Sequence, residues 1–137
     1  MHGCIVKGEC MRTKADFRAL RERCGLSITD IADALGVQTR SVRRWETPGY
    51  PEPPEDAWRA LDDFEGMLAH KVAENVAAIQ ESGGDTATLP YWRTQEDYDR
   101  EGPGDGPFGI ANRAAIETAT WLEERHVIVS FSYVDGE

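Results

Sequence analysis

Three arginines, Arg40, Arg43 and Arg44, lie within five positions in a 137-residue chain whose formal net charge is −10. A guanidinium group binds phosphate oxygens strongly, and it can donate two parallel hydrogen bonds to O6 and N7 of guanine. Gln38 lies just upstream, and its amide can pair with adenine in the same two-pronged way. These residue types at this spacing predict contact with a nucleic acid.

A helix over residues 39–46 would separate these arginines from the apolar side chains. At about 100° per residue, Val42 and Trp45 fall on one side and the three arginines on the other. Glu46 is the one acid in this stretch, and it projects away from them. A plain solvated helix surface is the alternative, but such surfaces usually interleave acids with bases. We therefore expect one packed face and one cationic face.

The preceding residues predict two further helices joined by tight turns. Thr13 and Ser27 are good N-caps, because their hydroxyls can accept hydrogen bonds from the first helical turn. Gly25 and Gly36 stand where glycine commonly ends a helix, while Gln38 is an unusual cap for the third helix. The predicted helices span residues 13–24, 27–35 and 39–46. The last two, with the short turn at Gly36, have the spacing of a helix-turn-helix.

This stretch resembles the helix-turn-helix of the lambda repressor/Cro superfamily, also called the xenobiotic-response-element type. The matching residues are Leu20, Arg21, Gly25, Leu26, Ser27, Ile31, Ala32, Leu35, Gly36, Val37, Val42, Arg44, Trp45 and Glu46. Two positions depart from the family pattern. Ile28 stands where the family often has a phosphate-contacting glutamine, and Gln38 stands where it usually has serine.

The resemblance implies that the third helix enters the major groove of DNA with its N-terminal end toward the base edges. Base contacts would then come from Gln38, Thr39, Arg40 and Arg43. Contacts with the DNA backbone would come from Ser27, Thr29 and Arg44, although Arg44 could instead have an intramolecular partner. Val42 and Trp45 are assigned to the core.

The rest of the chain is predicted to be a connector, a long helix and a small mixed region. Residues 47–54 hold four prolines and cannot be helical. The further predicted elements are a helix over 54–81, a strand over 86–92, a short helix over 95–100, a helix over 111–125 and a strand over 127–134. The sequence thus predicts a mainly α fold, with an N-terminal helix-turn-helix bundle, a long central helix and a small α+β C-terminal part with two short strands.

We expect three segments: an N-terminal extension over residues 1–10, a helix-turn-helix domain with its long fourth helix over 11–82, and a small α+β dimerisation region over 83–137. The overall layout resembles YdiL-like and anti-CRISPR-associated regulators. Two strands alone make a marginal sheet, so we expect a homodimer formed through the last strand or the long helix. The alternative is a monomer in which Cys4, Ile5 and Val6 supply a third strand.

Composition excludes several other classes of protein. No apolar run approaches the ~20 residues that cross a bilayer, and three cysteines at irregular spacing make no disulfide framework. His2, Cys4 and Cys10 lack a fourth ligand nearby, so we expect no metal. No set of residues combines nucleophile, base and oxyanion support, so we expect neither an enzyme nor a cofactor. A cytoplasmic location is the expectation from these features.

The charge is divided unevenly along the chain. Residues 1–50 carry a formal charge of +3 and the remaining residues −13, so an acidic total need not oppose DNA binding at one basic face. We expect a sequence-specific, DNA-binding transcriptional regulator, most simply a dimeric bacterial or phage repressor that binds an inverted repeat. The alternatives are a protein-interaction module, for instance an antitoxin-like protein that neutralises a partner, and an RNA-binding regulator.

Overall fold

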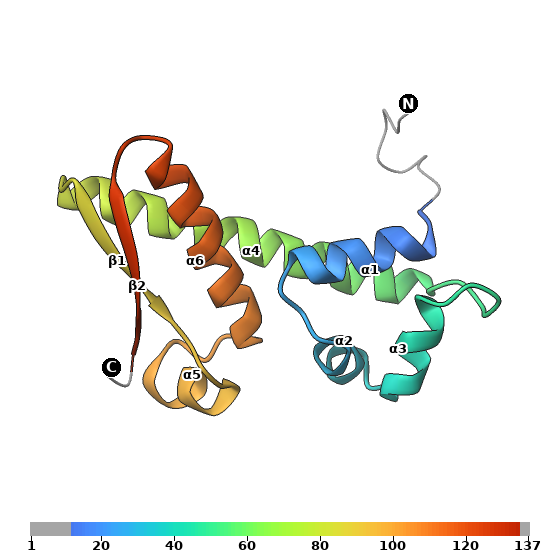
Figure 1. Ribbon diagram of the computed structural model, residues 1–137. Coiled ribbons are helices and arrows are strands. Elements are labelled where there is room, and N and C mark those ends of the chain that lie inside the picture. The colour runs from blue at the N-terminus through green and yellow to red at the C-terminus, as the bar shows by residue number, and fades with distance from the viewer. Residues whose placement is uncertain (1–11, 135–137) are drawn as a thin grey trace.

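The computed structural model describes residues 12–134 and divides them into two connected parts (Figure 1). Its elements in chain order are α1 (Lys14–Arg23), α2 (Ile28–Leu35), α3 (Thr39–Trp45), α4 (Glu55–Ser82), β1 (Thr86–Tyr91), α5 (Gln95–Glu101), α6 (Phe108–Glu123) and β2 (Ile128–Tyr133). The predicted mainly α fold is therefore confirmed, with a helix-turn-helix unit at the N-terminal side, a long helix and two short strands.

Side-chain caps explain why the helices begin where they do. Thr13 and Ser27 each accept a hydrogen bond from the backbone N–H three residues on, at 3.0 Å in both cases. Asp16 and Asp30 complete two capping boxes by accepting from the cap residues' own N–H groups. Thr94 caps α5 in the same manner. These starts are visible in the sequence because the chemistry is local.

The first core joins α1, α2 and α3 to the first half of α4. Phe17 is its centre, with no exposed surface, and its ring meets Trp45 and Trp58 edge to face, with centroids 6.0 and 5.1 Å away. Ile110 and Ala114, from the start of α6, also pack into this cluster. Burying rings of this size supplies much of the apolar area that holds a small domain together.

Helix α6 joins the two parts of the molecule. It packs along α4 and covers one face of the β1–β2 sheet, where Leu89 of β1 lies buried against Ala115 and Ala119 of α6. Figure 1 shows α6 standing between the strands and the three N-terminal helices, with α4 passing behind both. The strands are parallel, with Leu89 opposite Phe131 in register, and residues 92–127 form the crossover connection that parallel pairing needs.

Two elements differ from the sequence-based expectation. Helix α6 begins at Phe108 rather than at residue 111, because its first turn follows the glycine- and proline-rich loop at once and Pro107 occupies the cap position. The alternation in β2 predicted a half-buried strand, yet Phe131 and Tyr133 are each 44% exposed. The reason is that α6 buries Leu89 of β1, whereas β2 has no further strand on its other side within the described residues, so its rings stay partly in solvent.

Other sequence-based expectations concern absences. None of the helices between residues 12 and 134 is long and apolar enough to span a membrane. The same residues contain no grouping of histidine, cysteine or acidic side chains suited to a metal ion. The possible ligands His2, Cys4 and Cys10, and the possible third strand at Cys4, Ile5 and Val6, lie outside the described residues.

Candidate nucleic-acid interface

The turn between α2 and α3 is set by one left-handed residue. Gly36 has φ +67°, and the N–H of Val37 returns to the carbonyl of Ala32 at 3.0 Å. This arrangement ends α2 and lets the chain change direction within a few residues. Gln38 then takes an extended conformation and precedes α3, although its side chain makes no capping hydrogen bond.

Helix α3 has the two faces that the sequence predicts. Val42 is fully buried, and Trp45 is half-buried with its ring against Phe17. Arg40, Arg43 and Arg44 are exposed on the other side. The packing of Val42 and Trp45 therefore fixes which side of this short helix stays in solvent.

The exposed arginines interact with uncharged neighbours. An Nη2 atom of Arg40 donates to the side-chain oxygen of Gln38 at 3.1 Å, and Nη1 of Arg43 donates to the hydroxyl of Thr39 at 3.2 Å. The guanidinium of Arg44 lies 5.3 Å from the centre of the Tyr50 ring. None of the ion pairs formed within residues 12–134 includes these three arginines, so their positive charges are not offset by a bound carboxylate.

Glu46 is held away from that face by Arg21 of α1. The guanidinium of Arg21 donates to both carboxylate oxygens, at 2.7 and 2.9 Å, and a third hydrogen bond runs to the carbonyl of Leu26 at 2.9 Å. The hydrogen bond to Glu46 raises the pKa of Arg21 above its ordinary value despite the opposing effect of burial. The ion pair connects the end of α3 to α1. It also engages both carboxylate oxygens of Glu46, which is the one acidic residue among residues 38–46.

Lys14 stabilises α3 from its C-terminal end. Its ammonium donates to the carbonyls of Arg44, Trp45 and Pro51 at 3.0, 3.1 and 2.7 Å. The last carbonyls of a helix have no partner inside the helix, and the negative end of the helix dipole favours a cation there. Sequence analysis missed this role, and it missed the contact of Tyr50 with Arg44. A lysine thirty residues upstream carries no local signal for it.

The remaining predicted DNA-contacting residues lie at the N-terminal end of α2. Ser27 and Thr29 are both exposed. The Ser27 oxygen accepts from the backbone of Asp30, but the hydroxyl hydrogen stays available to donate. The free backbone N–H groups of this first turn point outward with the positive end of the helix dipole, which suits a phosphate oxygen.

Cys24 behaves as a core residue. It has no exposed surface, and burial raises the pKa of its thiol to about 11. The thiol therefore stays protonated and unreactive near neutral pH. The structure gives this residue no chemistry beyond packing.

The site as a whole is a cationic surface on a short, firmly seated helix. Its exposed polar groups are an amide, hydroxyls and guanidinium groups, which are the groups that contact base edges and phosphates. Residues 15–74 match the family model described as "Helix-turn-helix domain". A comparison with curated proteins found no match for the chain. The N-terminal part of this protein, from α1 into α4, therefore has the helix-turn-helix fold, and its similarity to this family supports DNA binding by this part.

Proposed function

We propose that the protein is a sequence-specific transcriptional repressor that binds duplex DNA as a dimer. The observation that carries the proposal is the free cationic face of α3, in which Arg40, Arg43 and Arg44 are exposed and have no carboxylate partner within the described residues. Opposite this face, Val42 anchors the helix in the core. A helix seated in this way can enter the major groove as a rigid element.

Each residue then has a distinct task. Gln38, Thr39 and Arg40 lie at the N-terminal end of α3, and Arg43 lies about one turn further along. These four residues contact base edges, whereas Arg44, Ser27 and Thr29 contact the DNA backbone. Arg40 and Arg43 each give up a weak contact with a neighbouring uncharged side chain when they bind. A good two-pronged contact with the correct base is worth about 1–3 kcal/mol of discrimination. The protein acts by occupying DNA, not by catalysing a reaction.

The distribution of charge supports binding through this end alone. The segment 1–50 carries a formal charge of +3 and the rest of the chain −13. Negative charge remote from the DNA repels the phosphates and limits non-specific binding, so that few positive contacts carry the attraction. Affinity is then expected to fall as salt concentration rises.

A dimer gives such a domain enough contact area for specific recognition. Two copies related by a two-fold axis place two α3 helices on the same side of the duplex, about one helical turn or 34 Å apart. The bound sequence must then be an inverted repeat, because the symmetry of the DNA site mirrors that of the protein. Occupation of such a site within a promoter blocks transcription.

The experiment is selection of bound duplexes from a random pool by the full chain. Enrichment of an inverted repeat, lost when Arg40 and Arg43 are both replaced by alanine, supports the proposal. Recovery of a single half-site supports DNA recognition but removes the dimer. No enrichment at low salt overturns the proposal and favours a protein-interaction role for the same domain.

A further inference from the structure

The outer edge of β2 carries an exposed run of apolar side chains. Ile128 is 70% exposed and Val134 42%, and Phe131 and Tyr133 are each 44% exposed. Residues 127–134 include no charged side chain, although the chain as a whole is strongly acidic. Sheet edges in soluble proteins are usually protected by charged residues or proline, so an edge of this composition is ready to pair with another strand.

The backbone of β2 faces outward at three of its residues. The N–H of Ile128 donates to the carbonyl of Asp85 at 2.9 Å, so Ile128 turns its polar backbone groups toward β1. Because the direction alternates along a strand, Val129, Phe131 and Tyr133 turn theirs away from β1. The groups of Val129 and Phe131 have no strand beside them, because within the described residues the sheet consists of β1 and β2.

The opposite edge of the sheet is protected. The same alternation turns the backbone of Thr86, Thr88 and Pro90 away from β2, and proline has no N–H to donate. A strand added at the β1 edge would therefore lack one hydrogen bond, because Pro90 has no N–H, whereas β2 contains no proline. This difference selects β2 as the edge that pairs.

The sequence of β2 is nearly symmetric about Phe131. The residues one position before and after Phe131 are both serine. Two positions away they are Val129 and Tyr133, and three positions away they are Ile128 and Val134. When a strand pairs with a copy of itself across a two-fold axis, each residue meets the one at the mirrored position. Residue types that are symmetric about a central position therefore suit self-pairing.

We propose that β2 pairs antiparallel with β2 of a second copy of this chain, with Phe131 opposite Phe131 of the partner subunit, to form a continuous four-stranded sheet. The inference rests on the proposed dimeric regulator and names its interface. Val129 then faces Tyr133 of the partner subunit, and Ile128 faces Val134 of the partner subunit. All these opposed side chains are apolar or aromatic, and such cross-strand pairs stabilise a sheet.

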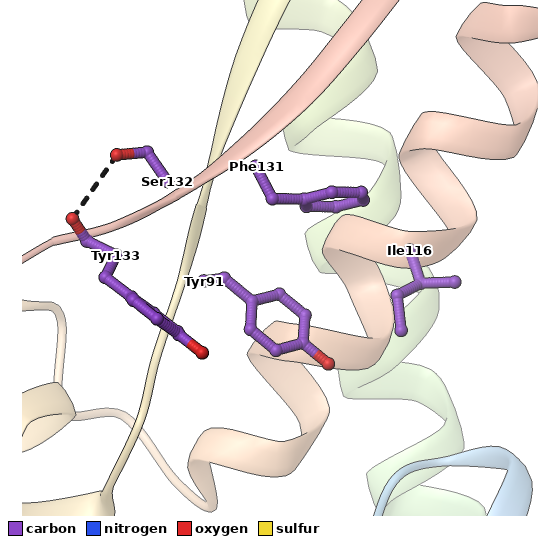
Figure 2. A pocket seen from close by; sticks show the side chains of 5 residues that line it. All are labelled: Tyr91, Ile116, Phe131, Ser132 and Tyr133. Atoms are coloured by element: carbon purple, nitrogen blue, oxygen red, sulfur yellow. Dashed lines mark hydrogen bonds between the residues drawn. The ribbon is translucent and has the colours of Figure 1, made fainter. Parts of the chain in front are cut away.

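A groove beside β2 accommodates the partner's rings. It has a volume of about 460 Å³ and is lined by Tyr91, Ile116, Phe131, Ser132 and Tyr133. Figure 2 shows the rings of Tyr91 and Phe131 directed toward Ile116 on α6, with the groove open beside them. In the paired sheet, Phe131 and Tyr133 of the partner subunit lie on this same face, where they cover the groove.

The arrangement also serves DNA binding. The two-fold axis of an antiparallel strand pair is perpendicular to the sheet, so both copies of α6 lie on one side of the four-stranded sheet. In each copy the helix-turn-helix domain lies beyond α6 on that same side (Figure 1). Both α3 helices are therefore on the same side of the dimer, where one duplex can reach them.

The first test measures the mass of the full chain in solution without DNA, by light scattering at tens of micromolar. The wild type is expected at twice the chain mass of 15.3 kDa. In the proposed register Ser130 faces Ser132 of the partner subunit, so the double substitution S130K/S132K should halve the mass by placing like charges opposite each other. The matched control S130K/S132E places opposite charges there and should remain dimeric.

A second test fixes the register by disulfide formation, in a chain that also carries Cys4→Ser and Cys10→Ser. A mixture of S130C and S132C chains should form a disulfide-linked pair, because directly opposed residues lie within disulfide reach. S130C alone should not, since two copies of that position lie about 8 Å apart. Circular dichroism checks that each variant is folded.

Several outcomes overturn the interface: a wild-type mass of 15.3 kDa, a dimer that survives S130K/S132K, or equal cross-linking by S130C alone. The selection of duplexes is a separate measurement. If the chain dimerises and cross-links as predicted but selects no duplex, the interface is supported and the proposed function is wrong. A monomer that still selects a duplex overturns the interface and the dimer but leaves DNA recognition by α3 supported.

Discussion

The backbones of Gly25 and Gly109 meet so closely that neither position has room for a side chain. A Cβ atom on Gly109 would lie 2.0 Å from the carbonyl oxygen of Gly25, and a Cβ on Gly25 would lie 2.4 Å from that of Gly109. The contact joins the turn before α2 to the first turn of α6. It therefore couples the helix-turn-helix domain to the part of the chain that holds the sheet.

The substitution Gly109→Ala should lower the free energy of unfolding. The added methyl group meets a backbone oxygen, which cannot rotate away as a side chain can, and overpacking of this kind costs about 1–3 kcal/mol. Urea denaturation of the two proteins at neutral pH measures the change.

Gly66→Ala is the matched control, since this glycine lies within α4 and its added Cβ would have no neighbour within 4 Å. Alanine is the better helix former by about 1 kcal/mol, so this variant should be more stable than the wild type. Equal effects of the two substitutions would contradict the close contact between Gly25 and Gly109.

The sequence predicts the structure well where the determining chemistry is local. The caps Thr13, Ser27 and Thr94 fix the starts of their helices. The angular positions expected for side chains around α3 correctly place Val42 on the buried face and Arg43 on the exposed face. These features need only neighbours a few residues away. The family resemblance adds the placement of the first three helices, because the matching residues recur at fixed intervals along the chain.

Contacts between distant segments could not be predicted. Nothing beside Gly25 indicates that Gly109, far along the chain, lies against it. The parallel pairing of β1 with β2 depends on how the intervening helices pack, and the alternation in β2 does not reveal that no third strand from residues 12–134 lies beside it. Lys14 likewise reaches the end of α3 only because α1 and α3 are packed together.

The ion pair between Arg21 and Glu46 should contribute more to stability than an exposed pair does. The side chains are only 11% and 7% exposed, so Glu46→Ala leaves a guanidinium nearly buried without its partner. Loss of about 3 kcal/mol is expected. Glu22→Ala, which breaks the exposed pair with Arg18, should cost less than about 1 kcal/mol. Similar losses in the two variants, measured by urea denaturation, would contradict a structural role for Glu46.

Arginine substitutions should separate base contacts from backbone contacts. Arg40→Ala or Arg43→Ala should weaken binding to a selected duplex by about 1–3 kcal/mol while changing binding to random DNA much less. Arg44→Ala should weaken binding to both kinds of DNA. Fluorescence anisotropy at fixed salt measures each affinity. Arg100→Ala, remote in α5, removes the same charge and serves as control; an equal effect there would reduce the role of α3 to general electrostatics.

Acid should weaken the packing of α4 against the loop after α5. Lys71 donates to both carboxylate oxygens of Asp105, at 2.9 and 2.8 Å, and the Tyr98 hydroxyl also donates to this carboxylate. The hydrogen bond from Lys71, followed by that from Tyr98, lowers the pKa of Asp105 below its ordinary value. The resulting stability is present above the unfolded pKa, which is about 4, and is lost as pH falls through the lowered value.

Asp105→Asn should therefore be less stable than the wild type at pH 7, and the difference should shrink between about pH 4 and pH 2. The effect is modest, since the Asp105 side chain is half exposed. Lys71→Gln should also reduce the loss of stability in acid, because it removes the main cause of the lowered pKa. A difference from the wild type that stays constant with pH would contradict this assignment.

The central claim is that arginines of α3 contact guanine in the major groove, and replacement of guanine by 7-deazaguanine tests it most directly. This base lacks N7, which guanine exposes only in the major groove, and keeps its Watson–Crick pairing. In the selected duplex, the replacement should weaken wild-type binding at one or more guanines and should no longer matter at those positions in Arg40→Ala or Arg43→Ala. Wild-type affinity that stays unchanged for 7-deazaguanine at every guanine would contradict the account.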